Sequence, residues 1–365
     1  MAEETKLDKA RKIINEVDAE MRELFVRRMH AAEMVAEYKR ERGLAILDAK
    51  REAEIISRNA EKIEDEEIRS YYVNFLQNNM AVSRAYQSKL MEGMKVAYSG
   101  TEGAFAHIAT EKLYHTANKI AYDSFADAYR AVECGECDVA VLPVENSFNG
   151  EVGQVTDLMF SGSLYVNGML DLAVTQDLLG VKGADISDIK EVVSHPQALA
   201  QCAKYIKSHG FAEREYSNTA LAAKHVAELG DKGVGAIASG EAADIFGLDI
   251  LDHDINESKK NTTRFAVFSR VSGRRGDKDL RVHSILLFTV RNEAGALARA
   301  IDVIGNHGFN MRTLRSRPMK ELLWQYYFYV EAEGNIQSER GHAMLEELSE
   351  FCDRLKFAGT YLEME

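Results

Sequence analysis

The chain has 365 residues, which is enough for two or three domains, and 46% of its residues are hydrophobic. Its formal net charge is -13, which argues against a general nucleic-acid-binding surface. Any anionic ligand must therefore be bound by local cations, against the overall field. The first residues are charged, and there is no run of about 18 apolar residues that could span a membrane. We expect a soluble cytoplasmic protein.

The first ninety-two residues contain one glycine, Gly43, and no proline, which is typical of a helical segment. Apolar residues recur there at three- and four-residue steps: Ile13, Ile14, Val17, Met21, Leu24, Phe25, Ala32 and Val35. The first helix should run from about residue 7 to 41, or roughly 50 Å. A domain of ninety residues has a radius of gyration of about 13 Å, so a helix of this length cannot bury its apolar stripe within one domain. We therefore predict a helical dimer.

Spaced polar residues run through the same segment: Arg11, Arg28, Lys39, Asp48, Arg51, Glu52, Ser83 and Gln87. Arg28 and Lys39 are eleven residues apart, so they lie within about 20° of one helix face and roughly 16 Å apart along it. Arg11 is rotated by about 100° from Arg28 and cannot easily share that site on one helix. In a dimer, Arg11 can reach the partner's site.

The later polar residues also share faces. Asp48, Arg51 and Glu52 follow i, i+3, i+4 spacing, and Ser83 and Gln87 are four apart. The alternative interpretation is a solvated, charged helix bundle, in which any single pair arises by chance. The complete set favours a site for a small molecule with more than one negative charge.

This set resembles that of the all-helical chorismate mutase family, and the match covers about ninety residues. The resemblance implies an intertwined helical dimer with two sites, each of which takes Arg11 from the other chain. The reaction would be the Claisen rearrangement of chorismate to prephenate, which needs a folded conformer and charge stabilisation rather than a nucleophile. In that family's pattern, Arg11 and Arg28 would bind the two carboxylates, and the catalytic Lys39 and Gln87 would donate to the ether oxygen. Glu52 would contact the ring hydroxyl. The pocket would be completed by Asp48, Arg51 and Ser83.

From Met94 onward, short apolar runs alternate with helical patterns, which indicates an α/β fold. The strand-like runs are 95–98, 139–142, 192–193, 234–237 and 265–268, with helical patterns at 198–206 and 220–229. Cys134 and Cys137 form a CxxC pair, but a zinc site needs about four ligands and no second cysteine pair exists. A redox pair would open a helix, whereas Cys137 leads into a strand. We expect neither a metal site nor a cofactor.

Four segments of this zone carry polar residues next to predicted elements: 100–103, 142–147, 194–197 and 261–265. In the third, Ser194 and Gln197 form a capping-box pattern with Pro196 in the first turn. Free N–H groups at helix starts are good anion sites. For each segment taken alone we favour a local structural role, as a cap, a turn or a buried hydroxyl.

Together these segments resemble those of the prephenate dehydratase family, over about residues 94 to 270. Thr263-Arg264-Phe265 is that family's signature, and segments 142–147 and 194–197 stand at the expected intervals. The resemblance implies a two-lobed fold like that of periplasmic binding proteins, with a cleft that converts prephenate to phenylpyruvate. Thr263 would be the catalytic residue and would donate a hydrogen bond to the leaving hydroxyl. A threonine is a weak acid at pH 7, so we expect a positioned hydrogen-bond donor rather than a full general acid.

The other substrate-binding residues that this resemblance implies are Asn146, Ser147, Ser194, Gln197, Thr219 and Arg264, of which Arg264 would bind a carboxylate. Glu145 is either an acid or a structural turn residue. For His195 we favour a structural role.

Residues 272–279 are polar and contain glycine, so we expect a linker. The elements expected after it are strand 284–290, helix 296–306, strand 310–316, strand 323–331, helix 338–355 and strand 359–362. This βαββαβ order is typical of a small ferredoxin-like unit.

Asn292-Glu-Ala-Gly-Ala-Leu297 resembles a motif of the ACT regulatory domains attached to prephenate dehydratases, which bind phenylalanine between paired domains. The implied effector residues are Asn292, Gly295, Ala296, Leu297, Ser316 and Arg317. The family's second motif reads Glu-Ser-Arg-Pro, but this chain has Arg315-Ser-Arg-Pro318, so the strength of inhibition is left open. The alternative is a pure dimerisation module.

We therefore predict three domains, at 1–92, 94–271 and 282–363, in a bifunctional enzyme of phenylalanine biosynthesis inhibited by phenylalanine. It would act on chorismate and prephenate as a homodimer or larger homo-oligomer. One alternative is a dehydratase alone, with a helical dimerisation segment. Another is a non-catalytic amino-acid sensor. Preference for prephenate or arogenate, and transfer of prephenate between sites, are not predicted.

Overall fold

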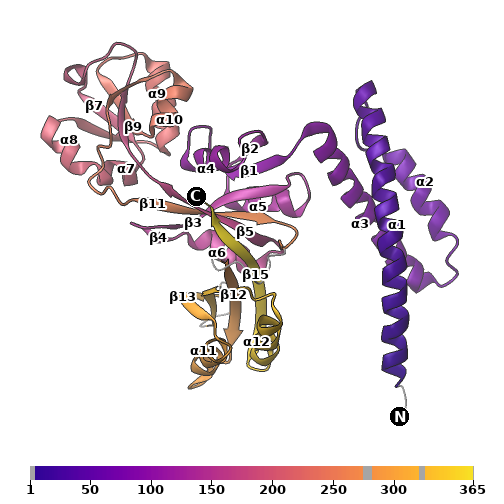
Figure 1. The fold of residues 1–365 in the computed structure, drawn as a ribbon. Coiled ribbons are helices and arrows are strands. Elements are labelled where there is room, and N and C mark those ends of the chain that lie inside the picture. Colours follow the sequence, from indigo (N-terminus) through magenta and orange to yellow (C-terminus); the bar gives the residue numbers. More distant parts are fainter. Residues whose placement is uncertain (1–4, 274–281, 320–324, 365) are drawn as a thin grey trace. The chain divides into compact units, whose positions relative to one another are not determined.

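The computed structural model describes residues 5–273, 282–319 and 325–364. Two compact units are present, residues 1–95 and 96–365 (Figure 1). Most of the predicted linker 272–279 and the start of the predicted strand 323–331 lie outside the described residues. Within the described part, no helix combines the length and the apolar character needed to cross a membrane.

The first unit consists of helices α1 (Lys6–Arg42), α2 (Ala49–Ala60) and α3 (Glu66–Glu92). A capping box formed by Thr5 and Asp8 begins α1, because each supplies an acceptor for a backbone N–H of the other. Gly43 ends the helix in the left-handed conformation, with φ of 61°. The predicted first helix and its break are thus confirmed.

The apolar stripe of α1 is largely exposed in the single chain. Its buried residues are Ala32 and Ala36, whereas Ile13 and Leu24 are each 61% exposed. Burial of a side chain of this size stabilises a protein by about 1.5–3 kcal/mol. A second chain that covered the stripe would therefore contribute substantially to stability.

The second unit contains a ten-stranded and a five-stranded sheet. The larger sheet has the order β13-β14-β12-β15-β5-β11-β3-β1-β2, with β4 paired to β3. Its first-lobe elements are β1 (Lys95–Ser99), α4 (Phe105–Leu113), β2 (Asn118–Tyr122), α5 (Phe125–Glu133), β3 (Val139–Asn146), β4 (Gly150–Glu151), α6 (Gly153–Ser161), β5 (Tyr165–Ala173) and β11 (Thr262–Ser269).

The five-stranded sheet forms the second lobe, in the order β10-β6-β9-β7-β8. Its elements are β6 (Asp177–Gly180), β7 (Glu191–Ser194), α7 (Pro196–Gln201), α8 (Ala203–His209), β8 (Ala212–Glu215), α9 (Thr219–Leu229), β9 (Val234–Ala238), α10 (Gly240–Phe246) and β10 (Asp249–Asp252). The chain enters this lobe after β5 and returns through β11, so two connections join the lobes.

The C-terminal elements are β12 (Val282–Val290), α11 (Ala296–Asn306), β13 (Asn310–Pro318), β14 (Tyr326–Glu333), α12 (Glu339–Ser349) and β15 (Cys352–Met364). Strand β15 continues from this part into the first lobe, where Leu362 pairs with Gly168 of β5 (Figure 1). Gly359 permits this close approach, since a Cβ there would lie 2.2 Å from the Val166 carbonyl oxygen.

Several local predictions were wrong. The helix expected at 338–355 ends at Ser349, because residues from Cys352 onward pair with β12. The helical pattern at 198–206 is divided at Cys202 into α7 and α8. Segment 142–147 does not follow a strand, since β3 extends through it to Asn146.

Candidate active sites

A cavity of about 280 Å³ lies among the three helices of the first unit. Of the eight residues predicted for this site, it collects all but Arg11. Its polar and charged lining comprises Arg28, Lys39, Asp48, Arg51, Glu52, Ser83, Arg84 and Gln87. Helices α2 and α3 and the α1–α2 connection thus meet the face of α1 that carries Arg28 and Lys39.

Arg28 is fixed at this cavity by α3. Its guanidinium donates to the hydroxyl of Ser83 and, at 3.4 Å, to the carbonyl of Asn79. Burial lowers the pKa of Arg28, although nearby Glu52 opposes the shift. An arginine remains charged even so, and the planar guanidinium can bind a carboxylate with two hydrogen bonds.

Polar contacts also fix the connection between α1 and α2. Asp48 caps α2 by accepting from the backbone N–H of Arg51 at 3.0 Å. Lys39 donates to the carbonyl of Ile46 at 2.5 Å. On α3, Gln87 is only 8% exposed, and its buried Oε1 has no hydrogen-bond partner among the described residues. An unpaired buried amide oxygen can accept a hydrogen bond from a ligand.

Arg84 was missed by the sequence analysis. Its Nη1 donates to both carboxylate oxygens of Glu52 at 2.5 Å, which links α3 to α2 across the cavity. The signal was present, since Arg84 stands three residues before Gln87 and therefore shares its helix face.

Arg11 lies elsewhere in the single chain. It lines a shallow depression formed by α1 alone, with Asp8, Lys12, Asn15, Glu16 and Ala19. Seventeen residues of helix separate it from Arg28, which corresponds to roughly 25 Å. Arg11 therefore cannot reach the cavity of its own chain.

A second cavity, of about 520 Å³, lies between the two lobes of the second unit. Asn146 and Thr263 line it from the first lobe, and Gln197 and Thr219 line it from the second. Four of the seven residues predicted for this site are thus brought together. Further polar lining residues are Ser99, Asn149, Glu151, Gln176, His195, Gln201, Ser217 and Asn218.

A hydrogen-bonded network orients Thr263. Asn146 donates through Nδ2 to the hydroxyl oxygen of Thr263 and to Asn261, each at 2.9 Å. Asn261 in turn donates to Gln201 at 3.1 Å. Because the Thr263 oxygen accepts from an amide, its own hydrogen is free to be donated into the cavity.

None of the described residues that line this cavity is an arginine or a lysine. Helix starts provide an alternative source of positive potential. The first turn of α4 lines the cavity at Phe105 and Ala106, and no side chain caps this helix. Thr219 begins α9 at the opposite wall. Backbone N–H groups at these helix starts can therefore bind an anion, together with the hydroxyl and amide side chains that line the cavity.

His195 replaces Ser194 as the cap of α7. Its Nδ1 accepts from the N–H of Gln197 at 3.2 Å, which leaves Nε2 as the protonated nitrogen of the neutral ring. Ser194 is fully buried and donates to the carbonyl of Ile237, so it joins β7 to β9. The predicted capping box was wrong, but Pro196 occupies the first helical position as expected.

Three predicted residues do not line the cavity, namely Ser147, Ser194 and Arg264. Successive side chains of a strand point to opposite faces, so Arg264 points away from the face that carries Thr263. Its guanidinium pairs with Asp171 at 2.8 Å and with the buried Glu331 at 3.7 Å. Ser147 instead bridges the backbone of Lys260 and Thr262.

Both units match known protein families. The model of the family Chorismate mutase type II matches residues 10–88, and that of Prephenate dehydratase matches residues 96–272. A bifunctional chorismate mutase/prephenate dehydratase from Neisseria gonorrhoeae is 32% identical over 361 residues, which cover 96% of this chain and 95% of that protein. The chain belongs to the bifunctional chorismate mutase/prephenate dehydratase family. It is an enzyme of phenylalanine biosynthesis that converts chorismate to prephenate and prephenate to phenylpyruvate.

Two other similarities concern the second unit of this bifunctional enzyme. Arogenate dehydratase 2 from Petunia hybrida is 35% identical over 283 residues, covering 73% of this chain and 71% of that protein. The solved structure of a prephenate dehydratase from Arthrobacter aurescens, in complex with L-Phe, has a TM-score of 0.68 and 26% identity. It covers 74% of this chain and 90% of that chain.

The bifunctional enzyme has a third, smaller cavity in its C-terminal elements, of about 190 Å³. Asn292 and Leu297 line it, together with Arg291, Glu293, Gln325, Tyr326, Phe328, Asp353 and two residues of β12. Gly295 and Ala296 begin α11 beside it, with Gly295 in the left-handed conformation at φ of 81°. Ser316 is exposed on β13 and Arg317 points to the first lobe, so neither lines this cavity.

Proposed function

We propose that the cavity of the first unit is the mutase site and that it is complete only in a dimer. The charge of the cavity supports the mutase assignment. Arg28, Lys39, Arg51 and Arg84 supply four cations, against the two carboxylates of Asp48 and Glu52, and this excess of positive charge suits a dicarboxylate such as chorismate. The position of Arg11, which lies too far along α1 to reach the cavity of its own chain, supports the dimer.

In this proposal the residues bind and orient rather than react. Arg28 and the partner's Arg11 each hold one carboxylate, which selects the folded conformer. Lys39 and Gln87 donate to the ether oxygen, on which negative charge develops as its bond to carbon breaks. Glu52 accepts from the ring hydroxyl, while Asp48, Arg51 and Ser83 keep these groups in place.

A shared site predicts complementation between variants. Arg11→Ala and Arg28→Ala homodimers should each lose most mutase activity. After mixing and subunit exchange, one of the two sites of each heterodimer receives both arginines, so part of the activity should return. The measurement is the rate of chorismate consumption before and after subunit exchange. Mass spectrometry follows the exchange itself. Confirmed exchange without any recovery would contradict the shared site.

We propose that the cavity between the lobes is the dehydratase site. The cavity takes polar residues from both lobes, with Thr263 as a free hydroxyl donor. Loss of CO2 from prephenate leaves an electron pair that forms the aromatic ring and expels the ring hydroxyl, which takes up a proton to become water. Thr263 donates to that departing oxygen. The N–H groups at the starts of α4 and α9 bind the carboxylates, with Asn146, Gln197 and Thr219 around them.

The test of both assignments is incubation of the full chain with chorismate, with prephenate and phenylpyruvate measured over time. We expect prephenate to rise and then be consumed as phenylpyruvate forms. Arogenate supplied in place of prephenate measures the substrate preference. Failure to convert chorismate with normal conversion of prephenate would leave the helices as a dimerisation segment only.

We propose that the C-terminal elements form an ACT-type, ferredoxin-like regulatory domain that binds phenylalanine. The order βαββαβ, the motif at 292–297 and the L-Phe complex of the Arthrobacter aurescens enzyme support this proposal. Asn292 and Leu297 are the residues that we assign to phenylalanine, completed by a second copy of the domain. A pure dimerisation module is the competing function.

Phenylalanine should therefore inhibit phenylpyruvate formation. Asn292→Ala should raise the phenylalanine concentration for half-inhibition about tenfold. This change corresponds to the loss of one hydrogen bond to a charged group, roughly 1.5 kcal/mol. Dehydratase rates at increasing phenylalanine measure this. The reference variant is His342→Ala, on α12 outside the described lining of the cavity. Unchanged rates at all phenylalanine concentrations in the wild-type enzyme would favour the dimerisation module.

A further inference from the structure

Two arginines of the C-terminal strand β13 contact the wall of the dehydratase cavity. Arg315 and Arg317 are two residues apart, so they point to the same face of the strand. Arg315 pairs with Glu145 of β3, and Arg317 lies 3.3 Å from a carboxylate oxygen of Glu151 of β4. Glu145 and Glu151 are directly opposite one another in the β3–β4 hairpin. Like charges in that arrangement repel unless they are neutralised.

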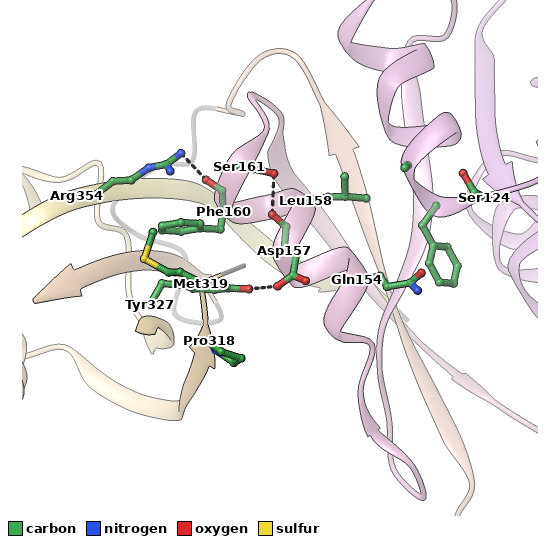
Figure 2. A pocket seen from close by; sticks show the side chains of 12 residues that line it. Ser124, Gln154, Asp157, Leu158, Phe160, Ser161, Pro318, Met319, Tyr327 and Arg354 are labelled. Carbon is green, nitrogen blue, oxygen red and sulfur yellow. Dashed lines mark hydrogen bonds between the residues drawn. The ribbon is translucent and has the colours of Figure 1, made fainter. Parts of the chain in front are cut away.

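Arg317 is itself held in place by a polar and aromatic cluster. Its Nε donates to Asp157 at 3.0 Å, and the hydroxyl of Tyr327 donates to the same carboxylate oxygen at 2.6 Å. The ring of Tyr327 stacks on Phe160 with centroids 4.2 Å apart (Figure 2). The C-terminal part is thus anchored to α6 directly beside the hairpin.

The same hairpin forms part of the cavity wall. Asn146, Gly150 and Glu151 line it. Asn146 also donates to Thr263, so a shift of the hairpin would displace the donor to the leaving hydroxyl. One oxygen of Glu151 has no hydrogen-bond partner among the described residues, and Arg317 is the described cation closest to the other. An uncompensated carboxylate here would repel a dianionic substrate.

We propose that Arg315 and Arg317 are positioning residues of the dehydratase reaction. They neutralise Glu145 and Glu151 and hold the β3–β4 hairpin in the position at which Asn146 orients Thr263. This inference rests on the proposed assignment of the cavity between the lobes as the dehydratase site. It makes strand β13 of the C-terminal part a structural component of that site.

The test measures kcat and KM for prephenate in the full-length enzyme without phenylalanine. Arg317→Ala and Arg315→Ala should each lower kcat about tenfold with a smaller change in KM, because the donor is displaced while the helix starts are retained. Arg317→Lys should recover part of kcat. Mutase activity, which belongs to the other unit, should be unchanged in all three variants.

The matched control is Arg354→Ala. Arg354 of β15 also joins the C-terminal part to the first lobe, through the carbonyl and ring of Phe160, but it does not contact the hairpin (Figure 2). It should retain kcat near that of the wild type. An equal loss in Arg354→Ala would overturn the inference, because docking of the two parts would then be the cause.

A charge exchange covers the case in which a single variant fails to fold. Arg315→Glu and Glu145→Arg should each lose activity, and the double variant should regain part of it. If the single variants have the kcat of the wild type, the inference is overturned. The proposed function is still upheld in that case, provided that the wild-type enzyme forms phenylpyruvate. No phenylpyruvate from the wild-type enzyme would instead refute the proposed function.

Discussion

Replacement of Arg28 by alanine should lower kcat/KM for chorismate by roughly 10²- to 10⁴-fold, since removal of one partner of a buried charge pair costs about 3–5 kcal/mol. Arg28 is half-buried, fixed by Ser83, and presents its guanidinium to the cavity. The loss should appear in kcat as well as in KM, because in the proposed site the contact of Arg28 with a substrate carboxylate also selects the reactive conformer.

The measurement is chorismate consumption by the full chain, with phenylpyruvate formation from added prephenate as the internal control. Arg28→Lys should recover only a small part of the loss, because an ammonium cannot form two parallel hydrogen bonds to a carboxylate. A nearby exposed arginine, Arg22, provides the matched variant. Equal rates in Arg22→Ala and Arg28→Ala would remove Arg28 from the site.

Replacement of Thr263 by valine should lower kcat for prephenate by roughly 10²- to 10³-fold, the effect expected from loss of one donor to a developing negative charge. Valine keeps the branched shape of the side chain and removes only the hydroxyl, so the strand β11 should be retained. KM should change less than kcat, because in the proposed site the helix starts bind the substrate carboxylates and Thr263 does not.

Thr263→Ser is the corresponding control, since it keeps a hydroxyl within reach of Asn146. It should retain a substantial part of kcat. Phenylpyruvate formation from prephenate measures both variants, and the mutase rate reports whether the chain is intact. A Thr263→Val enzyme with normal kcat would show that the leaving hydroxyl is assisted by another group.

Local sequence signals predicted the helical unit well. The absence of proline, the single glycine at position 43 and the apolar spacing located α1 to within one residue at either end. Rotation about one straight helix also placed Arg28 and Lys39 on a common face and separated Arg11 from them. Both results follow from the fixed geometry of a helix, in which position in sequence sets position in space.

Strand and loop positions were predicted less completely. Strands β2, β4, β5, β6, β8 and β10 were not predicted, although the family resemblance covered the segments that contain them. Short strands carry weak periodic signals and depend on their neighbours in the sheet. Residue types in segments 142–147 and 194–197 indicated a site, but they did not distinguish Asn146 from Ser147 or His195 from Ser194.

The sequence by itself determined the family, the order of the helical and α/β parts and the residues that helix geometry brings together. It also revealed the departure at Arg315, where an acid was expected. Only the tertiary structure decided that Arg264 points away from the cavity, that Arg84 pairs with Glu52, and that Arg315 meets Glu145. These contacts join segments between 32 and 170 residues apart, or depend on which face of a strand is covered. Local sequence does not encode either property, because both are set by the packing of distant elements.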